Sequence, residues 1–439
     1  MRREQFFSFA DRLNRRLRGD EVLFASLGVE DSDFVRLNRN RVRQAGHVHS
    51  ASLGLTLIHH RRQAQGDCLL AGDADADSTL AEDLLQRLRE RLRHVPDDPY
   101  LNFSDQALEI DRSIPADLPA TEDAVVALTD LADGLDLVGI WACGGIADGL
   151  ASSIGHRCWH ESHSFNLDWS CFADGDRAVK EGYSGFAWEP AELARRIARQ
   201  REQLAIMTRP QRQIEPGRYR AYLAPTAVQE LMDLLAWGGF GLRDHRTRQT
   251  PLLALADGEL SLHQGLDVSE AHGRGLAAGF TPEGFAKPPR VPLITGGRFA
   301  RCLTDARSAK EYGAEVNAAA EYPESIEVGP GDLPADAVLE RLDTGLFIGN
   351  LWYGNWSDRN SCRVTGMTRF GSFWVERGEL VAPLAAMRFD DSLYRLLGDR
   401  LEGLTREREL ILSAETYDGR STDSALLPGA LVSGIDLAS

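Results

Sequence analysis

The residues His156, Cys158 and His160 are the first feature of the sequence that could do chemistry, because imidazole and thiolate groups bind zinc. They alternate along a segment expected to be a strand, so their side chains would share one face. Neighbours on that face lie roughly 6.6 Å apart, so a zinc site there needs a further ligand from elsewhere. A polar strand face in a wide cleft or in solvent explains the same pattern, and we favour that interpretation.

The spacing of the histidines does not match a known zinc-peptidase motif. His160-Glu161 is the one His-Glu pair in the sequence. A zincin helix requires His-Glu-x-x-His, which places both imidazoles on one side with the glutamate as base. Ser164 and Phe165 occupy the positions where a second histidine would fall. The pair therefore does not indicate a zincin.

Two glycine-containing segments resemble catalytic or cofactor motifs but depart from them. The segment 182–185 would be part of a G-x-S-x-G nucleophile elbow only if position 186 were glycine, and it is Phe186. The segment 273–278 fits G-x-G-x-x-A, but the residues before it do not form a buried strand, which a dinucleotide site requires. Neither a serine hydrolase nor a dinucleotide-binding domain is indicated.

A basic run over 36–43 is unusual in an acidic chain. On a strand, Arg39, Arg41 and Arg43 would share a face, which could pair with carboxylates of a partner or with a peptide terminus. We favour the simpler interpretation of an exposed strand whose arginines pair with the chain's own acids.

Composition narrows the class of protein further. The chain has 439 residues, which suggests two or three domains, and a formal charge of −17, which makes it a poor nucleic-acid binder. No run of 18 apolar residues is present, so we expect no membrane-spanning helix. The six cysteines form no C-x-x-C pair, and the N-terminus lacks an export signal. We therefore expect reduced thiols and a cytoplasmic protein without nucleic-acid or membrane partners.

Hydrophobic periodicity predicts the elements of the first half. A first helix would bury Phe6, Phe9, Leu13 and Leu17, and the stretch 21–58 reads as several strands. A helix over 79–94 would begin at a capping box of Thr79 and Glu82. Further predictions are a helix near 121–133, a strand at 137–141, two strands at 156–172 and 178–188 joined at Asp174-Gly175, and a helix over 190–207.

The second half is predicted to be rich in strands. A strand over 219–224 and a helix over 225–237 precede long loops at 238–290. Strands are then expected at 291–295, 346–352, 364–376 and 380–389, with helices near 333–344 and 391–408. The sequence thus predicts an α+β chain, in which an α/β N-terminal part is followed by a β-rich C-terminal domain. The predicted parts are an α/β domain at 1–95, a Pro-rich linker or crossing at 96–120, a middle segment with a long hairpin and a helix at 121–208, and the β-rich domain at 215–439.

Several segments, taken in order, carry a family resemblance. They are EGYSGFAW at 181–188, PGRYRAYLAP at 216–225, FTPEG and PLITGG within 280–297, VNA and PGD within 316–332, and TGMTR, FWVE and GELVAP within 365–383. Their order and spacing resemble the TldD/PmbA family, also called the TldD/TldE peptidases, over nearly the whole chain.

The resemblance implies a cytoplasmic heterodimeric peptidase that digests unfolded or modified peptides. Its TldD-like subunit carries zinc on His-Glu-x-x-x-His and a cysteine, whereas its TldE/PmbA-like subunit lacks that motif. Here the segment after Pro225 reads TAVQELMD over 226–233, with acids and no histidine, and Cys362 alone cannot hold a catalytic zinc. We therefore expect a zinc-free TldE/PmbA-like subunit, with no cofactor of its own and with zinc in a TldD-like partner.

The expected task of such a subunit is to hold substrate for its partner. A peptide could add as a strand to a sheet edge, for which the strands at 156–188 and 364–389 are candidates. Asn355, Trp356 and Arg369 are the candidate substrate-binding residues, because they flank these strands and offer an aromatic ring and a carboxylate-binding guanidinium. Two alternatives stay open: a stand-alone peptide-binding or scaffold protein, and a zinc peptidase built on His156, Cys158 and His160.

Overall fold

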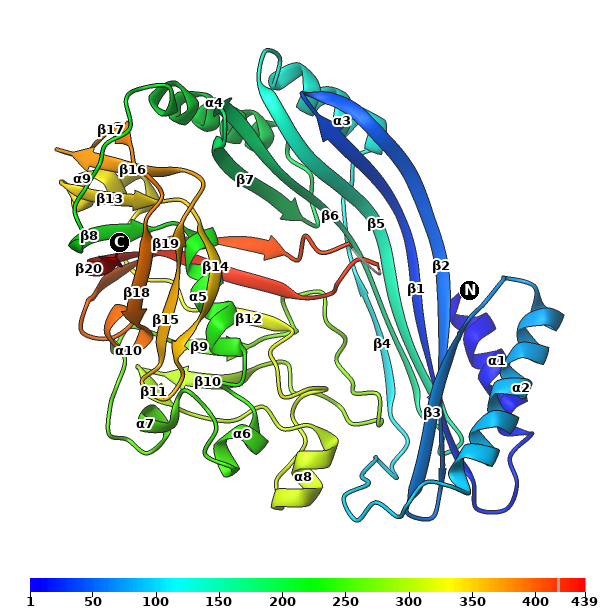
Figure 1. Cartoon of the computed structure of the whole chain (residues 1–439). Helices are drawn as coiled ribbons and strands as arrows, with labels where there is room; N and C mark the ends of the chain where they lie inside the picture. The colour runs from blue at the N-terminus through cyan, green and yellow to red at the C-terminus, as the bar shows by residue number, and fades with distance from the viewer. Residues whose placement is uncertain (417–418, 439) are drawn as a thin grey trace.

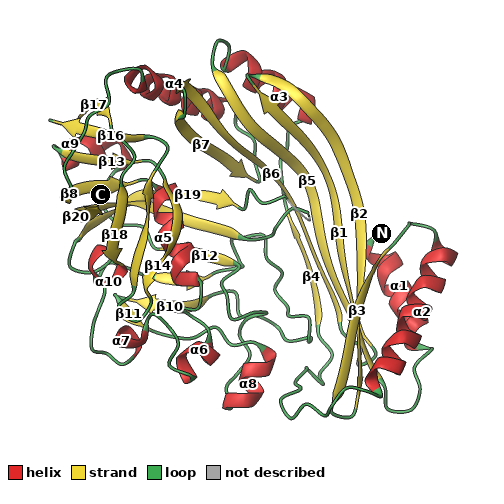
Figure 2. Ribbon diagram, in the orientation of Figure 1, coloured by secondary structure: helices red, strands yellow, loops and turns green. Residues whose placement is uncertain are grey.

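The computed structural model describes residues 1–416 and 419–438, which build two sheets (Figures 1 and 2). The N-terminal half forms a seven-stranded sheet, and the C-terminal half forms a thirteen-stranded one. Long curved strands of the first sheet stand beside the shorter, more varied strands of the second (Figure 1). The prediction of an α/β part followed by a β-rich part is confirmed.

The N-terminal sheet has the strand order β3-β2-β1-β5-β6-β4, with β7 also paired to β6. Its strands are β1 (Val22–Asn38), β2 (Arg41–His59), β3 (Arg62–Leu69), β4 (Glu109–Ile114), β5 (Asp136–Ser152), β6 (Arg157–Asp174) and β7 (Arg177–Gly185). Alternation sets the burial along them: Leu53, Leu55 and Leu57 are buried on one face of β2. The Asp174-Gly175 hairpin turn between β6 and β7 is confirmed, with Gly175 at a φ of 60°.

Four helices cover one face of this sheet, which we call the outer face. They are α1 (Arg3–Asn14), α2 (Ala74–Leu92), α3 (Thr121–Leu131) and α4 (Pro190–Met207). Phe6, Phe9 and Leu13 of α1 are buried, as predicted, whereas Leu17 lies beyond the end of the helix and is only partly buried. The opposite, inner face points toward the C-terminal half (Figure 1).

The predicted start of the second helix is wrong. α2 begins five residues earlier, at Ala74, because the carboxylate of Asp73 accepts hydrogen bonds from the backbone N–H groups of Asp75 and Ala76. Thr79 lies inside the helix, where its hydroxyl donates to the Asp75 carbonyl. The negative carboxylate of Asp73 caps the helix and is stabilised by the positive end of the helix dipole. It therefore sets the start of α2, and the capping box predicted at Thr79 does not form.

Removing this cap gives a direct test of where the helix starts. Asp73→Ala should lower stability by about 1 kcal/mol, which corresponds to a melting temperature lower by about 2–4 °C. Thr79→Ala is the matched control and should change little, because alanine is a better helix former than threonine in an interior position. The reverse order in thermal unfolding would place the helix start at Thr79.

The Pro-rich stretch 96–120 connects strands of one sheet. β1 pairs with β5 from Phe24↔Ser152 to Asn38↔Val138, so the segments 1–95 and 121–208 contribute neighbouring strands. β4 lies within the stretch and runs parallel to β6. The stretch is therefore a crossing within the N-terminal sheet.

The C-terminal half is dominated by short strands. They are β8 (Gly217–Leu223), β9 (Val268–Glu270), β10 (Val291–Thr295), β11 (Arg298–Phe299), β12 (Ser325–Val328), β13 (Gly345–Ile348), β14 (Leu351–Asp358), β15 (Arg363–Thr368), β16 (Ser372–Glu376), β17 (Glu379–Pro383), β18 (Arg388–Ser392), β19 (Leu401–Leu412) and β20 (Ser424–Ala438). The helices are α5 (Pro225–Ala236), α6 (Leu242–Arg246), α7 (Leu253–Ala256), α8 (Ala306–Tyr312), the 3-10 turn Ala335–Ala337, α9 (Val338–Leu342) and α10 (Leu393–Leu396). β8 and α5 match their predicted positions.

The predicted helix over 391–408 is wrong. The chain forms only the four-residue α10 there and continues as β19, which pairs with β20 from Leu412↔Ser424 back to Leu401↔Val432. The strands predicted at 364–376 and 380–389 are each divided in two. A turn with positive φ at Phe370-Gly371 separates β15 from β16, and residues 384–387 separate β17 from β18.

A loop of the C-terminal half fastens the two sheets together. The guanidinium of Arg420 donates to the carbonyl and hydroxyl of Ser164 and to the carbonyl of Gly144 on the inner face. The backbone N–H of Arg420 donates to Glu30 on the same face. Among the described residues, no helix is long and apolar enough to cross a membrane.

Candidate functional site

The exposed side of α5 carries two carboxylates where the sequence places the segment after Pro225. Glu230 and Asp233 are three residues apart and therefore lie on the same side of the helix. The opposite side is buried in the C-terminal core through Val228, Leu231 and Leu235. The Thr226 hydroxyl donates to the Gly349 carbonyl at 2.6 Å, which holds the helix start against the strand region. The fold thus fixes both carboxylates on a rigid element.

Glu230, Asp233 and Asp423 form a group that we call the acidic cluster. The side chain of Asp233 reaches water, but the surrounding protein excludes much of its hydration shell. This desolvation raises the pKa of Asp233 to about 7. The carboxylates of Glu230 and Asp423 raise this pKa further. Desolvation also raises the pKa of Glu230, while Lys180 of β7 lowers it. The cluster therefore lies between α5 and the N-terminal sheet, and it would attract a cationic group.

Exposed aromatic residues lie on β14, the strand beside α5. Trp352 is 45% exposed and Tyr353 is 77% exposed, with a φ of 58° that turns the strand locally. β14 pairs only with β15, so its other edge has no strand partner among the described residues. We call Trp352 and Tyr353, together with the open edge of β14, the aromatic ledge.

Arg369 joins this ledge to the N-terminal sheet. Its guanidinium lies 5.3 Å from the ring centre of Trp352 and 5.1 Å from that of Phe370. It also forms an ion pair at 3.2 Å with Asp176, in the β6–β7 turn. Arg369 therefore connects the two halves, and its positive charge is paired with the carboxylate of Asp176.

The other two predicted substrate-binding residues also lie on β14. Asn355 is exposed, and its side-chain oxygen accepts a hydrogen bond from the Trp356 backbone N–H at 2.8 Å. Trp356 packs against the C-terminal core, with the guanidinium of Arg359 5.7 Å from its ring centre. The structure thus brings Asn355, Trp356 and Arg369 to one hairpin, β14–β15. It adds Glu230, Asp233 and Asp423, which the sequence analysis did not select.

His156, Cys158 and His160 lie on the inner face and are fully buried. The expectation of a polar face in a cleft or in solvent is wrong, because a C-terminal loop covers them. His160 Nε2 lies 2.6 Å from the Leu276 carbonyl, and His156 Nδ1 lies 2.6 Å from the Ser152 hydroxyl. Gly284, at a φ of 85°, allows the loop to pass close to His156.

Burial determines the protonation of this trio. It lowers the pKa of His160 to about 4 and raises that of the Cys158 thiol to about 11. Across residues 1–416 and 419–438, no group of three His, Cys, Asp or Glu side chains is arranged to hold a metal ion.

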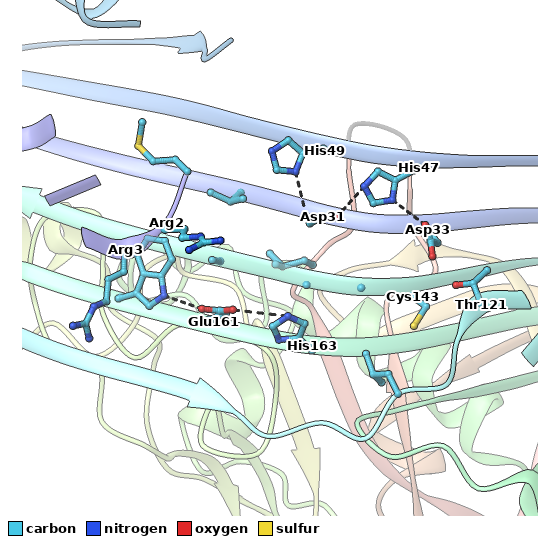
Figure 3. A pocket seen from close by; sticks show the side chains of 18 of the residues that line it. Arg2, Arg3, Asp31, Asp33, His47, His49, Thr121, Cys143, Glu161 and His163 are labelled. Carbon is cyan, nitrogen blue, oxygen red and sulfur yellow. Dashed lines mark hydrogen bonds and ion pairs between the residues drawn. The ribbon is translucent and has the colours of Figure 1, made fainter. Parts of the chain in front are cut away.

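A groove of about 940 Å³ lies on the outer face of the N-terminal sheet (Figure 3). His47 on β2 contacts Asp31 at 3.0 Å and Asp33 at 2.9 Å on β1, and His49 contacts Asp31 at 3.2 Å. The hydrogen bond with Asp33 is the main reason that the pKa of His47 is raised. These residues meet only through the register Asp31↔His49 and Asp33↔His47, which the sequence analysis did not foresee.

Comparisons with known proteins place the chain in a family. The model of the PmbA/TldA metallopeptidase C-terminal domain matches residues 216–439. The chain therefore belongs to the PmbA/TldD family, as its motifs indicated. None of the curated proteins matches it.

Solved structures of similar fold span the whole chain. The crystal structure of TldE from Thermococcus kodakarensis superposes with a TM-score of 0.78 at 13% identity, covering 99% of each chain. A putative modulator of a DNA gyrase from Thermotoga maritima gives 0.74 at 14% identity, covering 99% of this chain and 100% of the other. A putative modulator of DNA gyrase from Bacteroides thetaiotaomicron gives 0.75 at 14% identity, covering 99% and 98%. At these identities the likeness establishes the α+β fold.

Proposed function

We propose that this protein is the zinc-free subunit of a TldD/TldE-type zinc metallopeptidase, which degrades or processes unfolded or modified peptides in the cytoplasm. The observation that carries the proposal is on α5: its exposed side presents Glu230 and Asp233, and its sequence contains no histidine. A water-activating zinc requires three protein ligands and an open position. Peptide cleavage then depends on a TldD-like partner that carries His-Glu-x-x-x-His.

The chain's own contribution is to hold the substrate backbone. The aromatic ledge combines an open strand edge with two exposed rings, and main-chain hydrogen bonds to such an edge do not require a particular peptide sequence. Trp352 and Tyr353 would pack on side chains of the peptide. The acidic cluster would favour a positively charged group, such as a lysine or arginine side chain or the amino terminus of the peptide.

The test is to purify the chain alone and together with a family member that carries His-Glu-x-x-x-His. The pair should co-purify, contain zinc and cleave an unstructured peptide. This chain alone should neither contain zinc nor cleave the peptide. Stoichiometric zinc and cleavage by the isolated chain, both lost in the His156→Ala and His160→Ala variants, would overturn the proposal. Peptide binding with no association between the subunits would favour a stand-alone peptide-binding protein.

Substitution of the aromatic ledge tests the substrate-holding role. Trp352→Ala should weaken peptide binding by the assembled pair about 5- to 30-fold, because an aromatic anchor is worth about 1–2 kcal/mol. Leu69→Ala is a matched control, since Leu69 is 72% exposed on β3 of the N-terminal sheet. Fluorescence anisotropy of a labelled unstructured peptide measures both effects. Equal losses of peptide affinity in the two variants would show that the aromatic ledge is not part of the binding site.

A further inference from the structure

The first half of β2 is an open sheet edge. β3 pairs with β2 only over Ser52–His59, and no other strand of the described residues pairs with 41–50 on that side. The residues 41–49 are exposed on both faces of the sheet as well as along the edge. A strand that is open in three directions is a template for another strand.

The hydrogen bonds of Ala51 identify the free groups of this edge. The Ala51 carbonyl accepts from the Leu70 N–H, so Ala51 points away from β1. Main-chain groups alternate along a strand, so Ala45, His47 and His49 also direct their N–H and C=O away from β1. The side-chain contacts of His47 and His49 with Asp31 and Asp33 stabilise the strand and leave these main-chain groups open.

Positive charge is concentrated at one end of the same edge. Residues 34–66 contain six arginines and no Asp or Glu, in a chain whose formal charge is −17. Arg39 and Asn40, with φ of 53° and 54°, form the tight turn into β2, next to a groove of about 490 Å³ lined by Asn38, Arg39, Arg41, Val42 and Arg43.

The expectation that these arginines pair with the chain's own acids is wrong. Within residues 1–416 and 419–438, no carboxylate lies within ion-pair distance of Arg36, Arg39, Arg41 or Arg43. Arg39 also lies in the turn, so it does not share a strand face with Arg41 and Arg43.

We propose that the open edge of β2 over residues 41–50 is a docking surface for an extended, carboxylate-bearing segment of another protein. The segment adds to the N-terminal sheet as an eighth strand, hydrogen-bonded to Ala45, His47 and His49. Its carboxylates lie at the turn end, where the guanidinium groups of Arg41 and Arg43 donate hydrogen bonds to them in ion pairs. This surface is distinct from the aromatic ledge on β14.

Charge complementarity selects this partner over two others. Edge-to-edge pairing with a second copy of the chain would leave Arg41 and Arg43 without an acidic partner, because residues 34–66 contain no Asp or Glu. A nucleic acid would meet the arginines, but it cannot use the row of main-chain donors and acceptors, and it would approach a chain of −17 formal charge. An acidic strand uses both the free main-chain donors and acceptors of the edge and the positive charge of the arginines.

The test uses synthetic peptides and the full chain. The probe is a fluorescent ten-residue peptide of alternating valine and threonine with three glutamates at one end, made in both chain directions. At least one direction should bind by fluorescence anisotropy. The same peptide with lysines in place of the glutamates should bind at least about tenfold more weakly. A version N-methylated at alternate residues keeps the charge but loses the strand hydrogen bonds, and it should not bind.

Three variants locate the binding surface. Ala45→Pro removes one free edge donor without breaking a bond to β1, and Arg41→Glu with Arg43→Glu reverses the charge; each should weaken binding about tenfold or more. Arg87→Glu is the charge control on α2 and should not change binding. Melting temperatures verify that the variants fold.

Three results would overturn the proposal. The first is that neither peptide direction binds. The second is that the N-methylated peptide or a single-stranded oligonucleotide binds as tightly as the unmodified acidic peptide. This result would show that the surface binds negative charge without pairing as a strand. The third is dimerisation of the free chain that Ala45→Pro abolishes, which would assign the edge to a second copy.

Discussion

Replacing Asp391 by alanine should destabilise the C-terminal half by about 3–5 kcal/mol, because it leaves a buried guanidinium without its partner. The Asp391 side chain is fully buried and lies 2.8 Å from Arg400, whose own side chain is 6% exposed. Asp391 also accepts hydrogen bonds from the backbone N–H groups of Ser392 and Asp436. The carboxylate thus ties the end of β18, the residue before β19 and the end of β20 together.

The control for this prediction is Asp399→Ala. Asp399 is exposed, adjoins Arg400 and has no ion pair among the described residues, so its removal should change stability by less than about 0.5 kcal/mol. Chemical unfolding followed by tryptophan fluorescence measures both variants. Equal effects of the two substitutions would show that Arg400 is satisfied without Asp391, for example by Asp436, which lies at 3.2 Å.

The wrong helix prediction over 391–408 arose from a local leucine pattern. The leucines at 393, 396, 397, 401 and 404 have helical spacing, which led to the wrong helix over 391–408. In the structure, the chain leaves α10 after one turn, and β19 is held by β20, whose pairing segment lies beyond a connection of eleven residues. Periodicity within one segment carries no information about such a partner.

Elements with local signals were predicted well. α4 and α5 start at Pro190 and Pro225, because proline at the first helical position has the required φ and needs no donor. The strand divisions at Phe370 and over 384–387 escaped prediction, because a non-glycine residue with positive φ, such as Phe370, gives no such signal.

The candidate site was predicted only in part. Asn355, Trp356 and Arg369 were selected because they flank predicted strands, and they do lie on one hairpin. The acidic cluster joins Asp233 to Asp423, which are far apart in sequence and meet only after the C-terminal core has formed. The burial of His160 likewise depends on a loop from the other half of the chain.

The loop that covers His160 creates a cluster of buried titratable side chains between the two halves of the chain. On its side lie Glu270, His272 and Lys287, and on the inner face of the sheet lie Asp148 and His160. Lys287 forms an ion pair with Glu324, and Arg112 donates to the carbonyls of His272 and Gly273. Oxygen Oε1 of Glu270 and nitrogen Nδ1 of His160 have no hydrogen-bond partner among the described residues. The contact between the halves therefore favours uncharged forms of several groups.

We expect the stability of this contact to fall as the pH rises from about 4.5 to about 7, because the losses from two carboxyl groups exceed the gain from one imidazole. Desolvation raises the pKa of Glu270 to about 7 and that of Asp148 to about 6. The stability that their protonated forms provide is lost as the pH rises from about 4 through these values. Desolvation lowers the pKa of His160 to about 4, so its contribution is lost as the pH falls from about 6.5 toward 4.

Two sets of substitutions separate these contributions. Asp148→Asn with Glu270→Gln keeps the side chains polar without their charge, and it should remove most of a loss of about 2–4 kcal/mol between pH 5 and pH 8. His160→Gln should make that loss larger, because it removes the imidazole contribution that rises with pH up to about 6.5. Thermal unfolding across pH 4.5–8.5 measures both. Lys287, Glu324, His272 and Arg112 face the same groups, and their attraction and repulsion change the size of each contribution but not its direction. A double variant that retains the full loss would place the responsible carboxylates outside this contact.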